Sequence, residues 1–299
     1  MTMIHFVYPH DNTKIASPWC IGNEVIAELK QRGYGVTNYA WDDRTTVLPS
    51  PGDILIGHPA WESNCIMQNS CKTKGWKRIL LLAPPHWPYG ETILNECLTY
   101  ADKYLCIAGP YWDQMIKIKW WPKAKRLDMA IDIEKFPRIK GQLASPGTRG
   151  IAYIGCTVPQ KGPGYLEKII SRLDWLKWGH FGYGRINGAE EYGFCDFHTQ
   201  YAMQQLAKYD IIIAPGKQDA NPTTILEALC WGLYPIATIT SGWSYDVCSL
   251  ISSDNASEAA AAICDRVYDQ DLDEKLAGLQ KSLSRYTWSH FVDQIEEEL

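Results

Sequence analysis

Runs of consecutive apolar residues alternate along the chain with segments in which apolar residues recur every three or four positions. Such runs predict strands of a parallel sheet covered on both faces, and the recurring positions predict the helices that cover it. In the first half, the predicted strands span residues 3–8, 53–57, 78–83 and 104–108. A helix follows the first strand, because Ser17 and Pro18 favour a helix start and Gly33 favours its end. The pattern is that of a doubly wound α/β domain.

A second alternation of the same kind follows residues 137–150, whose Pro, Gly and Ser residues show no periodicity and predict a linker. The predicted strands here span 151–155, 176–182, 210–215 and 233–238, and the predicted helices span 165–173, 201–208 and 222–231. A last helix has one apolar stripe, made of Trp288, Phe291, Val292, Ile295 and Leu299. The chain is therefore predicted to be α/β, with Rossmann-like domains at 1–140 and 149–282 and a C-terminal helix within 283–299.

The composition of the 299 residues, 46% hydrophobic and 21% charged, excludes a disordered chain. No stretch approaches the length of a membrane span, and the N-terminal residues lack the features of a signal peptide. We therefore expect a cytoplasmic protein with no stable membrane insertion. The ten cysteines form no C-x-x-C pair and mostly lie in apolar runs, so we expect them to be reduced, with neither a zinc site nor a disulfide framework.

The net charge of −5 hides a difference between the two halves. Residues 1–148 contain 17 Lys and Arg against 14 Asp and Glu, and residues 149–299 contain 12 against 20, which gives +3 and −8. Within the basic half, residues 117–126 read K-I-K-W-W-P-K-A-K-R and interleave basic with aromatic side chains. Such a segment can meet lipid headgroups or stack on a nucleic-acid strand; the alternative is a solvated helix end followed by a strand.

Residues 215–238 carry the clearest candidate chemistry. A predicted strand ends there, and Asn221 and Pro222 are predicted to cap and open a helix whose first turn faces the carboxyl edge of the sheet, where ligands of such sheets bind. Backbone N–H groups around Thr223 and Thr224 lie at the positive end of the helix dipole, and the two hydroxyls add donors. Together they predict an anion site suited to a diphosphate.

Two carboxylates accompany this helix start. Asp219 lies in the preceding loop, and Glu227 lies in an otherwise apolar stretch, where a carboxylate is costly unless it accepts hydrogen bonds, for instance from ribose hydroxyls. A well-capped structural helix would not account for Glu227. A dinucleotide-binding fingerprint is disfavoured, because the turn after the first strand has no glycine and the G-Y-G-R-I-N-G of residues 182–188 has the wrong spacing.

Asp219 and Glu227 are separated by seven residues, with Pro222 between them and L-E-A-L-x-x-G-x-x-P-I-A-T around and after the second acid. This segment resembles the E-x7-E segment of retaining, nucleotide-sugar-dependent glycosyltransferases of the GT-B fold, of the family 4 type, with Asp in the first position. The resemblance implies that Asp219 and the amides after it hold the donor sugar and that Glu227 holds the ribose. It implies donor-binding roles for Cys156, Thr157, Asn221, Thr223, Thr224 and Glu227.

A second stretch, residues 153–162, is similar to the G-R-x-x-x-x-K-G loop of the same family. The resemblance implies that Lys161 neutralises the donor diphosphate. Cys156 stands where the family has Arg, so a second cation is expected from elsewhere, with Arg149 and Arg185 as the candidates.

Two further stretches match in the same order. Residues 130–136 resemble the family's N-G-I-D-x-x-x-F passage before the interdomain linker, with Ala in place of Gly, and residues 286–289 resemble its C-terminal F-S-W. In that family the last helix commonly crosses back to the first domain, which is the arrangement expected for residues 283–299.

In the first half, His86 follows a predicted strand and is placed like the family's histidine that hydrogen-bonds the donor sugar near its anomeric carbon. His58 occupies a comparable strand end, and for both the alternative is a loop histidine that donates to a backbone carbonyl. The histidines expected to be structural are His5, His180, His198 and His290. The resemblance thus implies catalytic roles for His86, Lys161 and Asp219.

The function implied is transfer of a sugar, with retention of its anomeric configuration, from a nucleotide-diphosphate sugar to an acceptor hydroxyl. UDP-sugars are the expected donors, and no metal and no further cofactor are expected, because no D-x-D passage accompanies the site. The acceptor is a glycan, a lipid carrier, a small molecule or modified DNA. Two alternatives stay open: a nucleotide-sugar epimerase of GT-B fold and a non-catalytic donor-binding protein.

Overall fold

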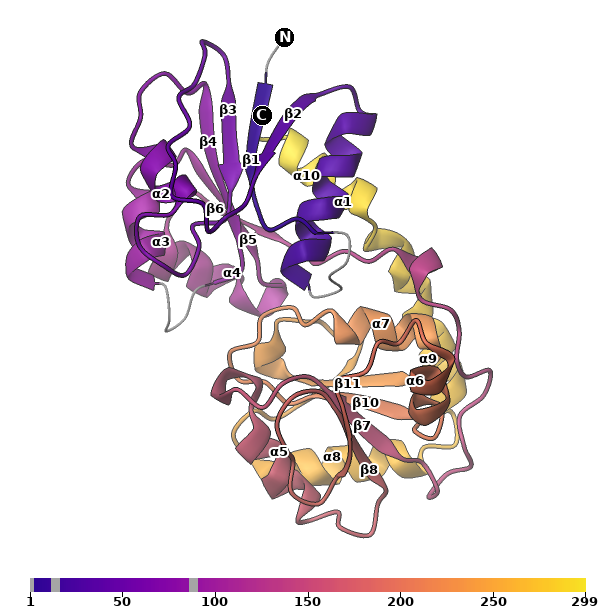
Figure 1. The fold of residues 1–299 in the computed structure, drawn as a ribbon. Coiled ribbons are helices and arrows are strands. Elements are labelled where there is room, and N and C mark those ends of the chain that lie inside the picture. The colour runs from indigo at the N-terminus through magenta and orange to yellow at the C-terminus, as the bar shows by residue number, and fades with distance from the viewer. Residues whose placement is uncertain (1–2, 12–16, 86–90) are drawn as a thin grey trace. The chain divides into compact units, whose positions relative to one another are not determined.

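The structure is a computed structural model that describes residues 3–11, 17–85 and 91–299. The chain forms two compact units, each built on a six-stranded parallel sheet with helices (Figure 1). Unit 1 comprises Met1–Ala108, Trp112–Met129 and Trp288–Leu299, and unit 2 comprises Gly109–Tyr111 and Ala130–Thr287. No helix within the described ranges is long and apolar enough to span a membrane.

The sheet of unit 1 has the strand order β2-β1-β3-β4-β5-β6, and every neighbouring pair is parallel. Its strands are β1 (Met3–Val7), β2 (Gly35–Tyr39), β3 (Ile54–Gly57), β4 (Arg78–Ala83), β5 (Lys103–Ile107) and β6 (Ala124–Leu127). The four inner strands are buried apolar runs and lie where the sequence predicts them. The two edge strands are half-exposed and lack such a run, and for this reason the sequence does not predict β2.

The helices of unit 1 are α1 (Ser17–Gln31), α2 (Ile66–Cys71), α3 (Glu91–Leu98), α4 (Asp113–Met115) and α10 (Trp288–Glu296). A π-helical turn, Ile116–Trp120, continues α4. Helix α1 starts at Ser17 as predicted, and Gly33, with φ +90°, follows its end in the left-handed conformation that favours glycine.

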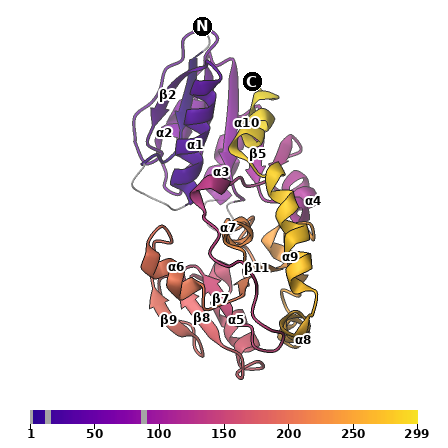
Figure 2. The same cartoon turned by 90° about the vertical axis from the view of Figure 1, so that its right-hand side faces the viewer.

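Helix α10 joins the N-terminal half of the chain in unit 1 and packs beside α1 (Figure 2). The predicted stripe is buried at Trp288, Phe291, Val292 and Ile295. On the polar side of the contact, Arg32 donates to Asp293 at 2.7 Å and also pairs with Glu296. The predicted return of the last helix to the first sheet is therefore confirmed.

The sheet of unit 2 has the order β12-β11-β10-β7-β8-β9 and is also parallel throughout. Its strands are β7 (Ile151–Ile154), β8 (Trp178–Phe181), β9 (Glu190–Gly193), β10 (Ile211–Ala214), β11 (Tyr234–Thr238) and β12 (Ser249–Ile251). Its helices are α5 (Pro163–Ile170), α6 (Gln200–Leu206), α7 (Thr224–Trp231), α8 (Ala256–Tyr268) and α9 (Leu272–Gln280). The sequence does not predict the edge strands β9 and β12 or the helices α8 and α9.

One core cluster joins the sheet of unit 2 to the helices on one of its faces. It consists of the buried residues Ala152, Phe181, Leu206, Tyr209, Ile212, Ala228, Trp231 and Leu233. Phe136, from the stretch that resembles the pre-linker passage, packs against Trp231 with ring centroids 5.9 Å apart. This packing holds the apolar face of α7 against the sheet.

The connections of unit 2 reverse direction between β7 and β10. Strand β7 leads through α5 to β8 on one side, whereas its neighbour on the other side, β10, comes later in the chain. In open parallel sheets the loops at such a switch point diverge and leave a crevice at the carboxyl edge, where ligands bind. The loops after β7 and β10 are the two that contain the predicted donor-binding residues.

Candidate active site

The loops after β7 and β10 meet at the switch point. Lys161, in a 3-10 turn after β7, places its Nζ 2.9 Å from Oδ2 of Asp219, in the loop after β10. The backbones of the two loops also approach closely. A Cβ added to Gly162 would lie only 2.4 Å from the carbonyl oxygen of Pro215. Gly162, the N-cap residue that precedes α5, also has φ +70°, so glycine is favoured here on two counts.

The ion pair raises the pKa of the Lys161 amine, mainly through the negative charge of Asp219 and further through Cys156 and Glu227. The amine is thus a cation at neutral pH, and part of its surface stays exposed. A group that reaches the carboxyl edge of the sheet therefore meets a fixed positive charge next to a carboxylate. Among the predicted site residues, the structure brings Lys161, Asp219, Cys156 and Glu227 into one electrostatic neighbourhood.

Buried hydrogen bonds hold the start of the β7 loop. The Tyr153 hydroxyl donates to the Cys156 carbonyl oxygen at 2.7 Å, and the His180 ring stacks on Tyr153 at 5.3 Å. Since a carbonyl can only accept, Nε2 of His180 carries a proton toward Gly155, 2.9 Å away, and Nδ1 lies 2.6 Å from Glu191. His180 is fully buried and structural, as expected.

Helix α7 begins later than predicted. Thr223 occupies the cap position, and its side chain makes no capping hydrogen bond to the backbone, so the prediction of an Asn221 cap is wrong. Asn221 instead adopts the left-handed conformation with φ +59°, which Asn tolerates better than most residues, and its N–H donates to Ser241 at 2.6 Å. This bond ties the β10 loop to the turn after β11, and Thr224 becomes the first residue of α7.

Glu227 lies in the first turn of α7 and is half-buried. This burial raises the pKa of Glu227 to about 7, although a hydrogen bond from Thr223 and the charges of Lys161 and His198 act in the opposite direction. The Thr223 hydroxyl thus donates to the Glu227 carboxyl. The sequence predicts this hydroxyl as a donor to the bound anion and does not predict this bond. Near neutral pH the carboxyl can either donate or accept a hydrogen bond.

Arg149 does not supply the second cation. Its guanidinium is buried and donates to four backbone carbonyl oxygens: Ala144 at 3.0 Å, Arg266 at 2.9 Å, Val267 at 3.3 Å and Asp269 at 2.7 Å. It also precedes β7, so it lies at the amino edge of the sheet, whereas the β7 loop lies at the carboxyl edge. Arg149 instead fixes the segment after α8 to the start of the second sheet.

Two other cations lie on loops at the carboxyl edge. Arg185 follows β8 and is exposed, on a loop that Thr157 contacts by donating its N–H to Tyr183 at 3.0 Å. Lys217 lies in the loop after β10, three residues beyond its end, and is also exposed, with its Nζ 5.3 Å from the Tyr165 ring. Sequence reasoning missed Lys217, although a lysine soon after a buried strand end is a usable signal.

In unit 1, His58 follows β3 at the carboxyl edge of the first sheet. It is buried, its Nδ1 accepts from the Ala60 N–H at 2.9 Å, and its ring packs edge-on to Tyr8 and Trp41 at 5.4 and 4.7 Å. This bond differs from the predicted alternative, in which the ring donates to a carbonyl. His86 lies outside the described residues, so its predicted role stays a prediction.

No protein-family model and no curated protein matches the chain. Solved structures do match its fold. Sucrose-phosphate synthase from Thermosynechococcus elongatus aligns with a TM-score of 0.71 and 11% identity, over 100% of this chain and 98% of that one. The catalytic domain of starch synthase IV from Arabidopsis thaliana, bound to ADP and acarbose, aligns with 0.68 and 11%, over 99% and 98%.

A third structure, the lipopolysaccharide outer core galactosyltransferase WaaB in its apo form, aligns with a TM-score of 0.68 and 13% identity over the whole of both chains. These neighbours are glycosyltransferases of the GT-B fold, and the chain has this fold. At such low identity the similarity concerns the arrangement of helices and strands alone.

Proposed function

We propose that the chain is a retaining glycosyltransferase that uses a nucleotide-diphosphate sugar, UDP-sugars above all, and requires no metal ion. The observation that carries the proposal is the Lys161–Asp219 ion pair at the switch point of the second sheet, next to the first turn of α7 and to Glu227. One site thus offers a cation, the N–H groups of a helix start and two carboxyls, which are the groups that would bind a diphosphate, a sugar and a ribose together.

Lys161 and the first turn of α7 would hold the diphosphate, because both present positive charge to the same edge of the sheet. A phosphate oxygen beside Lys161 would compete with Asp219 for the ammonium group. Donor binding would then release Asp219 to accept hydrogen bonds from sugar hydroxyls. Glu227 would accept hydrogen bonds from the ribose, which favours its ionised form and lowers its pKa.

In the transfer step, the bond from the anomeric carbon to the phosphate oxygen breaks, and its electron pair leaves with the diphosphate. The acceptor oxygen forms its bond on the same face of the sugar and passes its proton to the departing phosphate. The negative charge on the leaving group grows as the bond breaks, so Lys161 stabilises the transition state more than the bound donor. His86 is proposed to contact the sugar in this step, and the acceptor to be a glycan, a lipid carrier, a small molecule or modified DNA.

The proposal is tested by a thermal-shift screen with UDP, ADP and GDP and with the matching nucleosides, since a ligand that binds the native state raises its melting temperature. At least one diphosphate should stabilise the protein, and Lys161→Ala should weaken its binding by about tenfold to 150-fold, the loss of a charge-assisted hydrogen bond. Lys168→Ala, an exposed lysine on α5, is the matched control and should bind as wild type does.

Nucleoside binding should change little in Lys161→Ala, because the lost charge faces phosphate. If Lys161→Ala lost nucleoside and diphosphate equally, Lys161 would have no phosphate-binding role. Absence of stabilisation by every diphosphate would contradict the proposed donor class.

A further inference from the structure

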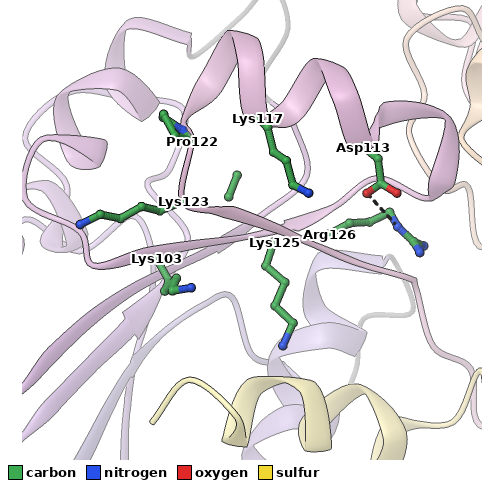
Figure 3. Close-up of a pocket in the computed structure, with 8 residues that line it drawn as sticks. Lys103, Asp113, Lys117, Pro122, Lys123, Lys125 and Arg126 are labelled. Atoms are coloured by element: carbon green, nitrogen blue, oxygen red, sulfur yellow. Dashed lines mark hydrogen bonds and ion pairs between the residues drawn. The ribbon is translucent and has the colours of Figure 1, made fainter.

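A basic pocket of about 340 Å³ lies at the edge of the first sheet, between the helical segment 113–120 and the outermost strand β6 (Figure 3). The cations that line it are Lys103, Lys117, Lys123, Lys125 and Arg126. They come from β5, from the π-helical turn and from the segment that leads into β6 and β6 itself. All residues that line the pocket belong to unit 1.

Three of the five cations are neutralised by carboxylates of the same unit. Arg126 pairs with Asp113 and Asp128, Lys125 pairs with Glu297 and Glu298, and Lys103 pairs with Glu298. Lys125 and Arg126 belong to the exposed edge strand β6, where charged side chains also prevent pairing with another chain. These three cations are therefore accounted for within the fold.

Lys117 and Lys123 are different. Both are exposed, and no carboxylate in the described part of the chain pairs with either of them. Lys123 places its Nζ 5.1 Å from the Trp121 ring, and Lys117 extends from the π-helical turn toward the pocket (Figure 3). Two uncompensated positive charges thus border one opening, and this favours an anionic ligand.

Apolar side chains stand beside these lysines. Ile118, the residue after Lys117, is 82% exposed, and Met115, three positions earlier, is 42% exposed. Both aliphatic side chains therefore stand exposed on the same short helical segment, made of α4 and the π-helical turn that continues it. Such exposed aliphatic residues next to lysines are typical of segments that lie in the interface of an anionic membrane.

We propose that this surface, defined by Lys117, Lys123, Ile118 and Met115, docks the protein on an anionic phospholipid bilayer. The two lysines bind phosphate groups of the lipids, one of which enters the pocket, while Ile118 and Met115 enter the boundary between headgroups and acyl chains. The contact is peripheral and does not depend on the function proposed for unit 2.

The aromatic residues of the same segment argue for a membrane over a nucleic acid. Binding of single strands relies on exposed rings on which bases stack. Trp120 is only 4% exposed and packs against Trp112, and Trp121 is half-buried with Lys123 over its ring. The fully exposed apolar residue is the aliphatic Ile118, which offers no stacking surface.

The test is sedimentation of the 299-residue chain with phosphatidylcholine vesicles and with vesicles that also contain phosphatidylglycerol. Wild type should bind the anionic vesicles alone, and less at high salt. Lys117→Ala/Lys123→Ala should lower this binding by roughly 30-fold, from about 1 kcal/mol for each lysine near an anionic surface. Ile118→Ser should lower binding while its salt dependence remains, because it removes only apolar contact.

The control is Lys74→Ala/Lys77→Ala, which removes two exposed lysines elsewhere in unit 1 and should bind as wild type does. Circular dichroism melts of each variant separate a docking defect from unfolding. Equal binding by wild type and the Lys117/Lys123 variant would overturn the proposal. Binding of a single-stranded oligonucleotide, or of inorganic phosphate with no binding to anionic vesicles, would also overturn it.

Discussion

Glu227 is the residue at which stability and function are most closely coupled. Its pKa, raised to about 7 by burial, exceeds the value of about 4.5 in the unfolded chain, so the folded state binds the proton more tightly. The stabilisation from this proton is present in full below pH 4.5 and is lost as the pH rises through 7. Above pH 7 the protein carries a poorly solvated carboxylate.

Glu227→Gln should therefore flatten the dependence of the unfolding free energy on pH. Gln is neutral at every pH and has no proton to lose. Between pH 5 and pH 8 the unfolding free energy of the variant, relative to that of wild type, should therefore rise by up to about 3 kcal/mol. Urea unfolding at several pH values measures this. Parallel curves for the two proteins would show that Glu227 has an ordinary pKa.

The same variant should bind nucleotide diphosphate more weakly, by about 1.5 to 3 kcal/mol, because it loses a charge-assisted hydrogen bond to the ribose. The loss should be largest above pH 7, where the wild-type carboxyl is ionised. Calorimetric titrations at pH 6 and pH 8 test both statements. An affinity unchanged at both values would remove Glu227 from the donor site.

Cys156 offers a test of the charge at the β7 loop. Since Arg149 is engaged at the opposite edge of the sheet, Cys156→Arg should raise the affinity for the diphosphate, and more so in a Lys217→Ala background. Diphosphate titration at low salt measures the gain. An unchanged or lower affinity in both backgrounds would show that Arg185 or another cation already serves the phosphates.

At the scale of elements, the close approach of the β7 and β10 loops depends on Gly162. Gly162→Ala should destabilise the protein by at least about 1 to 3 kcal/mol, because its φ is +70° and the new Cβ would meet the Pro215 carbonyl. It should also weaken diphosphate binding by moving Lys161 away from Asp219. Thermal unfolding and diphosphate titration measure the two effects.

Gly164→Ala is the matched control, because Gly164 lies in α5 and a Cβ added there would have no neighbouring atom within 4 Å. There the substitution should be neutral or stabilise by roughly 0.5 to 1 kcal/mol, as expected for Ala over Gly within a helix. Equal effects of the two substitutions would rule out the close contact at Gly162.

The elements that the sequence predicts best are the ones whose burial is complete. Strands β3, β4 and β10 are continuous apolar runs, whereas β2 and β9 are edge strands whose half-exposed residues resemble loops. Lys161 and Asp219 are each predicted from a separate sequence motif, and neither motif indicates that the two residues meet. Their contact joins residues 58 positions apart and depends on the strand order, which no local pattern contains.

The error at Asn221 has the same origin. Locally, Asn followed by Pro is a good helix start. In the fold, a hydrogen bond to Ser241, from the turn after β11, holds Asn221 in the left-handed conformation, and the cap moves to Thr223. A long-range contact therefore overrides the local preference at the point where the loop must expose the first turn of α7.

At the scale of the whole molecule, the fold is shared with glycosyltransferases that have only 11 to 13% of residues identical. Two parallel sheets and a returning C-terminal helix need only apolar patterns, which many sequences satisfy. The proposed chemistry depends on few residues, and two residues proposed for it, Cys156 and Asp219, differ from the motif they resemble.

The most direct measurement is an NMR analysis of the anomeric centre after incubation with an α-linked nucleotide sugar and candidate acceptors. We expect an α-linked product together with free nucleotide diphosphate, and loss of both in Lys161→Ala. A β-linked product would contradict retention, because inversion needs a general base opposite the leaving group. A donor whose sugar is epimerised without any acceptor would contradict transfer itself.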